Sequence, residues 1–175
     1  MDSQRVTVIA PKTTTVAGFK TLPRLQQEIN SITRNHNTKV LSHVEHIDVL
    51  RVATDEETPD IVHFAGHMTS AGFVGSKGII PLSTIIMALQ TAEPKLAIFN
   101  TCSSRDVAVQ IASNCATDCI YTVDAVEDDR AFDFSVLFYS VLRSDDVDSY
   151  RHACNLVDPN DSVFHYIGGK RKARR

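Results

Sequence analysis

Two reactive side chains, His67 and Cys102, each follow a short apolar run at the same interval. The run DIVHFA covers residues 60–65, and one glycine separates it from His67. The run KLAIFN covers residues 95–100, and one threonine separates it from Cys102. A cysteine beside a histidine forms a nucleophile and its base, because the imidazole takes the thiol proton and later protonates the leaving amine. If the two runs are neighbouring strands, the pattern indicates covalent acyl transfer.

This chemistry also needs hydrogen-bond donors for the carbonyl oxygen of the substrate. The backbone N–H groups of Met68 and Cys102 are placed to supply them, and each well-aligned donor is worth about 3 kcal/mol. Cys102 also precedes an expected helix, whose amino end favours an anion. From spacing alone a plainer interpretation stays open, since a strand-end cysteine is often only a small apolar residue of the core.

The segments that must position this pair alternate between strands and helices. Strands are expected at about 5–10, 39–44, 60–65, 95–100 and 118–123, with a possible last strand at 163–168. Helices are expected at about 22–32, 47–57, 83–92, 105–115, 128–142 and 146–157. The alternation predicts an α/β fold with a mostly parallel sheet of about five or six strands and helices on both faces. In such sheets, ligands gather beyond the carboxyl ends of the strands, where His67 and Cys102 lie.

The composition fits one ordinary globular domain. The 175 residues are 43% apolar and 22% charged, and no run of 18 apolar residues predicts a membrane span. The opening MDSQRVTVIAP does not have the pattern of a secretory signal. We expect a cytoplasmic domain over residues 1–167, followed by a basic flexible tail over residues 168–175.

The four cysteines are expected to be free thiols, because a chain of this length needs no disulfides and contains no CxxC pair. A zinc site is the alternative. Cys115 and Cys119 are four apart, and His152 and Cys154 are two apart, but neither spacing is typical of zinc ligands. We therefore predict no metal and no other cofactor.

The formal charge of −3 is unevenly distributed, because the tail KRKARR carries five basic residues and leaves about −8 on the rest. An acidic body argues against a broad nucleic-acid surface. The tail could contact a phosphate backbone or a partner, but a solvated end after Gly168 and Gly169 is the favoured interpretation.

Taken together, several segments resemble the CHAT domain of caspase-like cysteine peptidases. IVHFAGH, a glycine-spaced loop, LAIFNTCSS and VAVQIA occur in the family's order. The same is true of RVTVIAP, LPRLQQEINSI, the DD-R-A-F helix and the HAC segment, so the resemblance covers about residues 5–167. The TCSS turn also resembles the cysteine turn of separase.

The resemblance implies a caspase-like fold and a cysteine endopeptidase that cleaves a protein or peptide substrate as a regulated effector. It assigns the general base to His67 and the nucleophile to Cys102. It places His63 inside its strand as support for the fold, and Asn100 at the wall of the pocket for the residue before the cut. The family commonly has glycine after the catalytic histidine, so we expect the side chain of Met68 to narrow the site.

Substrate preference depends on the loop after the strand at 118–123. Asp128 and Asp129 in this loop are expected to cap the following helix. Asp124 directly follows the strand, and a carboxylate there would pair with arginine or lysine. We predict cleavage after a basic residue, with Asp124 as its partner, whereas a pocket set by the neutral Asn100 would accept a small or apolar residue.

Two other hypotheses stay open. A catalytically inactive caspase-like scaffold would bind a partner protein, although the presence of both His67 and Cys102 favours the enzyme. A receiver or nucleotide-binding domain is disfavoured, because the chain has no GxGxxG after its first strand and no GxxxxGK[ST] loop. CHAT domains are commonly joined to repeat or sensor modules. These residues contain none, so an activating or regulatory partner protein is expected.

Overall fold

A six-stranded sheet forms the centre of the molecule, which is seen in a computed structural model that describes residues 4–144 and 146–170. The strand order is β2-β1-β3-β7-β8-β9, and only β9 is antiparallel to its neighbour among the described strands of this sheet. The strands are β1 (Arg5–Ile9), β2 (Asn37–Leu41), β3 (Ile61–Ala65), β7 (Leu96–Asn100), β8 (Asp118–Thr122) and β9 (Phe164–Ile167). The predicted α/β architecture with a mostly parallel sheet is confirmed.

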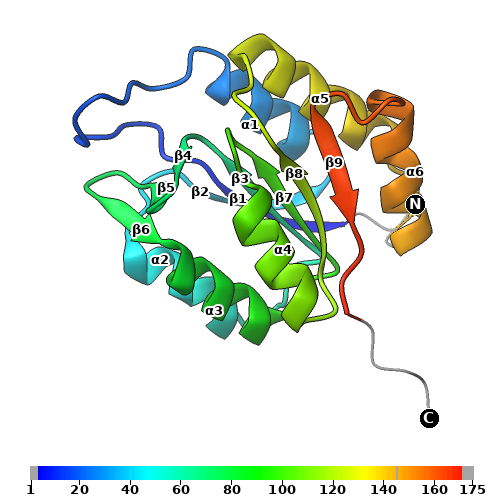
Figure 1. The fold of residues 1–175 in the computed structure, drawn as a ribbon, viewed down its shortest axis with the longest axis horizontal. Helices are drawn as coiled ribbons and strands as arrows, with labels where there is room; N and C mark the ends of the chain where they lie inside the picture. Colours follow the sequence, from blue (N-terminus) through cyan, green and yellow to red (C-terminus); the bar gives the residue numbers. More distant parts are fainter. Residues whose placement is uncertain (1–3, 145, 171–175) are drawn as a thin grey trace.

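Helices cover both faces of the sheet (Figure 1). One layer consists of α1 (Leu25–Thr33), α5 (Asp128–Val141) and α6 (Val147–Val157). The other consists of α2 (His46–Arg51), the short 3₁₀ helix η1 (Val52–Thr54), α3 (Leu82–Ala92) and α4 (Arg105–Asn114). Within the described ranges, no helix combines the length and the apolar character needed to cross a bilayer.

Alternating side chains of the central strands face the two helical layers. On β7, Leu96 and Ile98 pack in the cluster with α1, α5 and α6, whereas Ala97 and Phe99 pack in the cluster with α2, α3 and α4. Because both faces are buried, β3 and β7 are nearly continuous apolar runs in the sequence. The polar residues that interrupt these runs, His63 and Asn100, must therefore find partners in the interior.

The segment after β3, which was predicted as a loop, contains a small antiparallel sheet. Its strands are β4 (Met68–Thr69), β5 (Gly72–Val74) and β6 (Ile79–Pro81). Gly72 is needed here, because its φ is +152° and a Cβ would lie 1.9 Å from the carbonyl oxygen of Ile80. The glycines that suggested an irregular loop thus allow close approach of two short strands.

Two elements differ from the prediction in their bounds. β2 begins and ends earlier than the predicted strand at 39–44, because it pairs in register with β1 from Arg5↔Asn37 to Ile9↔Leu41. The helix predicted over residues 47–57 is α2 followed by η1, and it ends at Thr54.

The described part of the C-terminal tail is attached to the body. The backbone N–H of Gly169 donates to Asp118 Oδ1 at 2.8 Å. A Cβ on Gly169 would lie 2.5 Å from the carbonyl carbon of Ala116, so only glycine fits against this backbone. The N–H groups of Gly169 and Lys170 therefore join this segment to the body, and residues 171–175 lie outside the described residues.

Candidate active site

His67 and Cys102 leave the central sheet at the same end of neighbouring strands. β3 and β7 are parallel, and Ala65 pairs with Asn100. Each reactive residue therefore lies two positions beyond a paired residue, on strands that run about 4.8 Å apart. Both side chains are partly exposed, although the strands before them are buried. The sheet thus places the two residues on one edge, as a catalytic dyad requires.

The imidazole of His67 is held by the loop between β1 and α1. Its Nε2 lies 2.8 Å from the carbonyl oxygen of Lys20, and the ring of Phe19 lies 5.2 Å away, measured between centroids. Because a carbonyl only accepts hydrogen bonds, this contact requires a proton on Nε2. The neutral imidazole then keeps Nδ1 unprotonated, in the state needed for a base.

A strained turn presents Cys102. Ser103 directly after it has a φ of +48°, which is uncommon for a residue with a side chain. The turn is bonded to the end of β8, since Ser103 N donates to Asp124 O at 3.1 Å and Ser104 N donates to Thr122 O at 2.9 Å. The position of Cys102 therefore depends on β8 as well as on β7.

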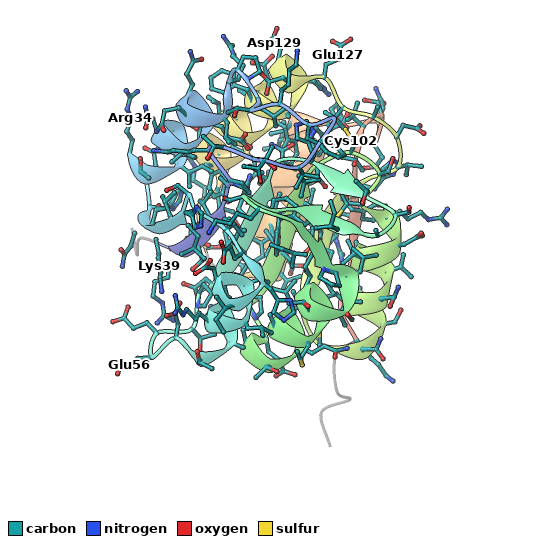
Figure 2. The ribbon with its side chains drawn as sticks, turned by 90° about the vertical axis from the view of Figure 1, so that its left-hand side faces the viewer. Arg34, Lys39, Glu56, Cys102, Glu127 and Asp129 are labelled. Atoms are coloured by element: carbon teal, nitrogen blue, oxygen red, sulfur yellow. The ribbon has the colours of Figure 1, made fainter. Side chains whose placement is uncertain are left out.

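The sulfur of Cys102 lies against the loop between β8 and α5. The backbone N–H of Val126 donates to Sγ at 3.4 Å, and Sγ lies 3.9 Å from the carbonyl oxygen of the same residue. An N–H group that points at sulfur stabilises negative charge on it. Figure 2 shows Cys102 at the end of the molecule that carries Glu127 and Asp129.

The other three cysteines are free and buried, so Cys102 alone among the four is partly exposed. Burial, together with Cys115 and Asp118, raises the pKa of Cys119 well above its ordinary value. Burial also raises the pKa of Cys154 to about 12, with a further contribution from nearby aspartates. Among the described residues, no three His, Cys, Asp or Glu side chains are grouped as metal ligands.

The β4–β5 ladder does not use the backbone N–H of Met68, and the residue is buried. His67 O accepts from Val74 N, so these two residues form the hydrogen-bonded pair at the start of the β4–β5 ladder. Met68 pairs with Phe73 at the next, non-hydrogen-bonded position, where its N–H is directed away from β5. The Met68 side chain is only 7% exposed and packs in the core, so it does not narrow the site as predicted.

Asn100 has a different place from the one that sequence resemblance implied. It is 2% exposed, and the two N–H donors of its Nδ2 are shared among Glu28 Oε1 at 2.7 Å, Ala131 O at 2.8 Å and Ser135 Oγ at 2.9 Å. The side chain faces the interior between β7, α1 and α5, and not an open pocket. His63 is also fully buried, inside β3 as expected.

The acidic residues of the β8–α5 loop divide into two groups. Asp124 is exposed, and its carbonyl oxygen accepts from the backbone N–H of Ser103, the residue after Cys102. Asp128 and Asp129 were expected to cap α5, but the N-cap is Glu127. They bind Arg24 instead: Asp128 Oδ2 accepts from its backbone N–H, and Asp129 forms an ion pair with its guanidinium.

No protein-family model matches the sequence, and no curated protein sequence matches it. Among solved structures, the chain is similar to the crystal structure of caspase-1 from Spodoptera frugiperda. The TM-score is 0.59 at 10% sequence identity, over 81% of this chain and 71% of the caspase chain. The fold is caspase-like.

Three contributions to the candidate site were not predicted from the sequence. Lys20 and Val126 act through backbone atoms, which no residue type reveals. The position of Glu28 was visible in the sequence, because its spacing puts it on the apolar face of the helix with Leu25, Ile29 and Ile32. A carboxylate on a buried helical face requires hydrogen-bond partners, and those of Glu28 are His63, Asn100 and Ser135.

Proposed function

We propose that this caspase-like chain is a cysteine endopeptidase of the CHAT type, with Cys102 as nucleophile and His67 as general base. The observation that carries the proposal is the register of β3 and β7, which puts both residues just beyond the same edge of the sheet. The hydrogen bond from His67 Nε2 to Lys20 O supports it, because it leaves Nδ1 as the basic nitrogen.

The reaction follows from these groups. His67 takes the proton of the Cys102 thiol, and the thiolate forms a bond to the carbonyl carbon of the scissile peptide. The negative oxygen that results accepts hydrogen bonds from the backbone N–H groups of Met68 and Cys102. As the C–N bond breaks, His67 gives its proton to the leaving amine. Water, deprotonated by His67, then hydrolyses the thioester and restores the thiol.

Asp124 is the proposed determinant of the residue before the cut. Its exposed carboxylate lies on the segment bonded to the turn of Cys102, and a carboxylate there favours arginine or lysine in the substrate. The buried Asn100 presents no surface of its own to a substrate side chain.

The proposed substrate is a protein or peptide in the cytoplasm, since four free cysteines suit a reducing compartment. Control by an activating partner protein is part of the proposal.

Acyloxymethyl ketone peptides that carry different residues at the reactive end test the proposed function. These reagents transfer the peptidyl ketone to a catalytic thiolate, and intact mass reports one adduct per chain. We expect fast labelling by arginine or lysine peptides and none in Cys102→Ala. A purified wild-type chain that no peptide labels, alone or with a binding partner present, would instead support the inactive scaffold.

A further inference from the structure

One buried oxygen, Oε1 of Glu28, binds three elements besides its own helix. It accepts from Asn100 Nδ2 on β7 at 2.7 Å and from Ser135 Oγ on α5 at 2.6 Å. It also lies 3.0 Å from Nε2 of His63 on β3. Glu28 is 4% exposed, and these three partners are 2% exposed or less. Three donors on one oxygen suit a carboxylate, which only accepts.

Each of the four elements joined by Glu28 continues directly into a group at the candidate site. The loop before α1 carries Lys20, whose carbonyl holds the imidazole. β3 leads into His67, and β7 leads into Cys102. The loop before α5 carries Val126, whose N–H points at the sulfur. The carboxylate therefore lies where it can fix the positions of all four groups relative to one another.

We propose that Glu28 is a positioning residue that sets the geometry between His67 and Cys102 from inside the protein. The inference rests on the proposed function, because it concerns the same pair. Glu28 contacts neither reactive residue in the hydrogen bonds of the described chain, so it acts through the strands and loops that carry them. A neutral side chain without an acceptor would leave buried donors unpaired and allow the four elements to shift.

The titratable groups on the side of Glu28 are His63 from β3, Tyr139 from α5 and Tyr150 from α6, which acts on Tyr139. Tyr139 OH lies 3.1 Å from His63 Nδ1, and burial raises the pKa of this phenol well above its ordinary value, followed by the effect of Glu28 itself. The half-buried ring of His36 lies against the far side of this group, 5.2 Å from the Tyr139 ring between centroids. These groups must be considered when a pH profile of a Glu28 variant is interpreted.

The test compares Glu28→Met, which removes the acceptor at similar length, with Glu28→Gln, which keeps one amide oxygen. Ser135→Ala removes a single donor and serves if Glu28→Met does not fold. Thr84→Val is the matched control, because it deletes one hydrogen bond of a buried side chain, between Thr84 Oγ1 and His46 Nδ1 at 3.1 Å, in the opposite helical layer. Each variant is measured for thermal unfolding, for kcat and KM on a basic peptide, and for the pH dependence of Cys102 alkylation by iodoacetamide.

We expect Glu28→Met to lower kcat by about 30-fold or more while KM changes by less than about threefold. Glu28→Met should also remove the contribution of His67 to the pH profile of Cys102 alkylation. In Glu28→Gln, most of the kcat and most of the His67 contribution should be retained. Ser135→Ala should give an intermediate loss of kcat, and Thr84→Val should lower thermal stability without changing kcat or the alkylation profile. If kcat in Glu28→Met or Ser135→Ala equals kcat in Thr84→Val, the positioning role is overturned.

The alkylation profile also separates this inference from the proposed function. A wild-type profile that is the same in His67→Ala would contradict the dyad itself. A wild-type profile that depends on His67 but is unchanged by Glu28→Met would contradict only the role of Glu28.

Discussion

The backbone N–H of Arg24 donates to Asp128 Oδ2 at 2.9 Å, which joins the β1–α1 loop to the first turn of α5. The guanidinium adds to this contact, with Nε 3.2 Å from Asp129 Oδ1 and the group 4.3 Å above the ring of Phe132. The β1–α1 loop holds the imidazole of His67, and α5 follows the loop that lies against the sulfur of Cys102. Arg24 therefore links the two sides of the candidate site at the surface.

Arg24→Ala should loosen both loops without unfolding the protein. We expect kcat to fall by about three- to tenfold and stability to fall by only about 1 kcal/mol, because exposed ion pairs and cation–π contacts are individually weak. Amide hydrogen exchange over residues 11–24 and 123–127 is the measurement. Lys39→Ala is the control, because it removes an exposed ion pair with Asp55 elsewhere on the surface. Unchanged exchange in both loops would contradict the link.

Loss of either dyad residue should abolish turnover and leave the fold intact. For Cys102→Ala and His67→Ala we expect kcat to fall by about a thousandfold or more, as for nucleophiles and bases that act as a unit. Both side chains are partly exposed, so the free energy of unfolding should change by about 1 kcal/mol at most. Peptide cleavage and urea unfolding measure the two quantities. A variant that retains a tenth of the wild-type activity would remove its residue from the mechanism.

Iodoacetamide should modify Cys102 in the folded protein long before the other three cysteines. Only the thiolate reacts, and a raised pKa keeps Cys119 and Cys154 protonated until the pH approaches their shifted values. Burial also blocks access of the reagent to them. Peptide mapping by mass spectrometry after a short reaction at slightly alkaline pH gives the order of modification. The same reaction in urea should label all four, and early labelling of Cys154 in the native protein would show that α6 opens.

Asp124→Ala should weaken cleavage after basic residues specifically. We expect kcat/KM to fall by about tenfold or more for arginine peptides and to change little for leucine peptides, because a charge partner is lost from the substrate side chain. A positional-scanning peptide library measures the preference. Glu56→Ala is the control, because it removes an exposed acid from the far end of the molecule (Figure 2). An unchanged preference in Asp124→Ala would assign specificity elsewhere.

Gly169→Ala should destabilise the fold, whereas Gly78→Ala should not. A Cβ at Gly169 meets the backbone of Ala116 at 2.5 Å, but a Cβ at Gly78 meets nothing within 4 Å. We expect a loss of about 1–3 kcal/mol for the first variant, typical of overpacking against a backbone that cannot move freely. Thermal unfolding compares the pair, and equal midpoints would mean that the segment at Gly169 is not held.

The sequence predicted the mostly parallel sheet, because buried parallel strands have a simple apolar pattern, and β3 and β7, which precede His67 and Cys102, are neighbours in it. It did not predict β4, β5 and β6, since strands of two or three residues are too short to show a period. The resemblance to CHAT domains implied a pocket position for Asn100, but this side chain is buried. The partners that bury Asn100 lie on α1 and α5, far away in sequence, so no local pattern reveals them.

The order of the strands also describes how the protein can be made. After β1 and β2 have paired, β3, β7, β8 and β9 join the same side of the sheet in the order in which the ribosome synthesises them. No strand has to be inserted between two that are already paired, so a nascent chain can extend its sheet as it emerges. The support for Cys102 comes late in this sequence, because Thr122 and Val126 are translated after it. A nascent chain at that stage would already have paired β1, β2, β3 and β7, but it would lack the hydrogen bonds that the segment after β8 makes to Cys102 and its turn.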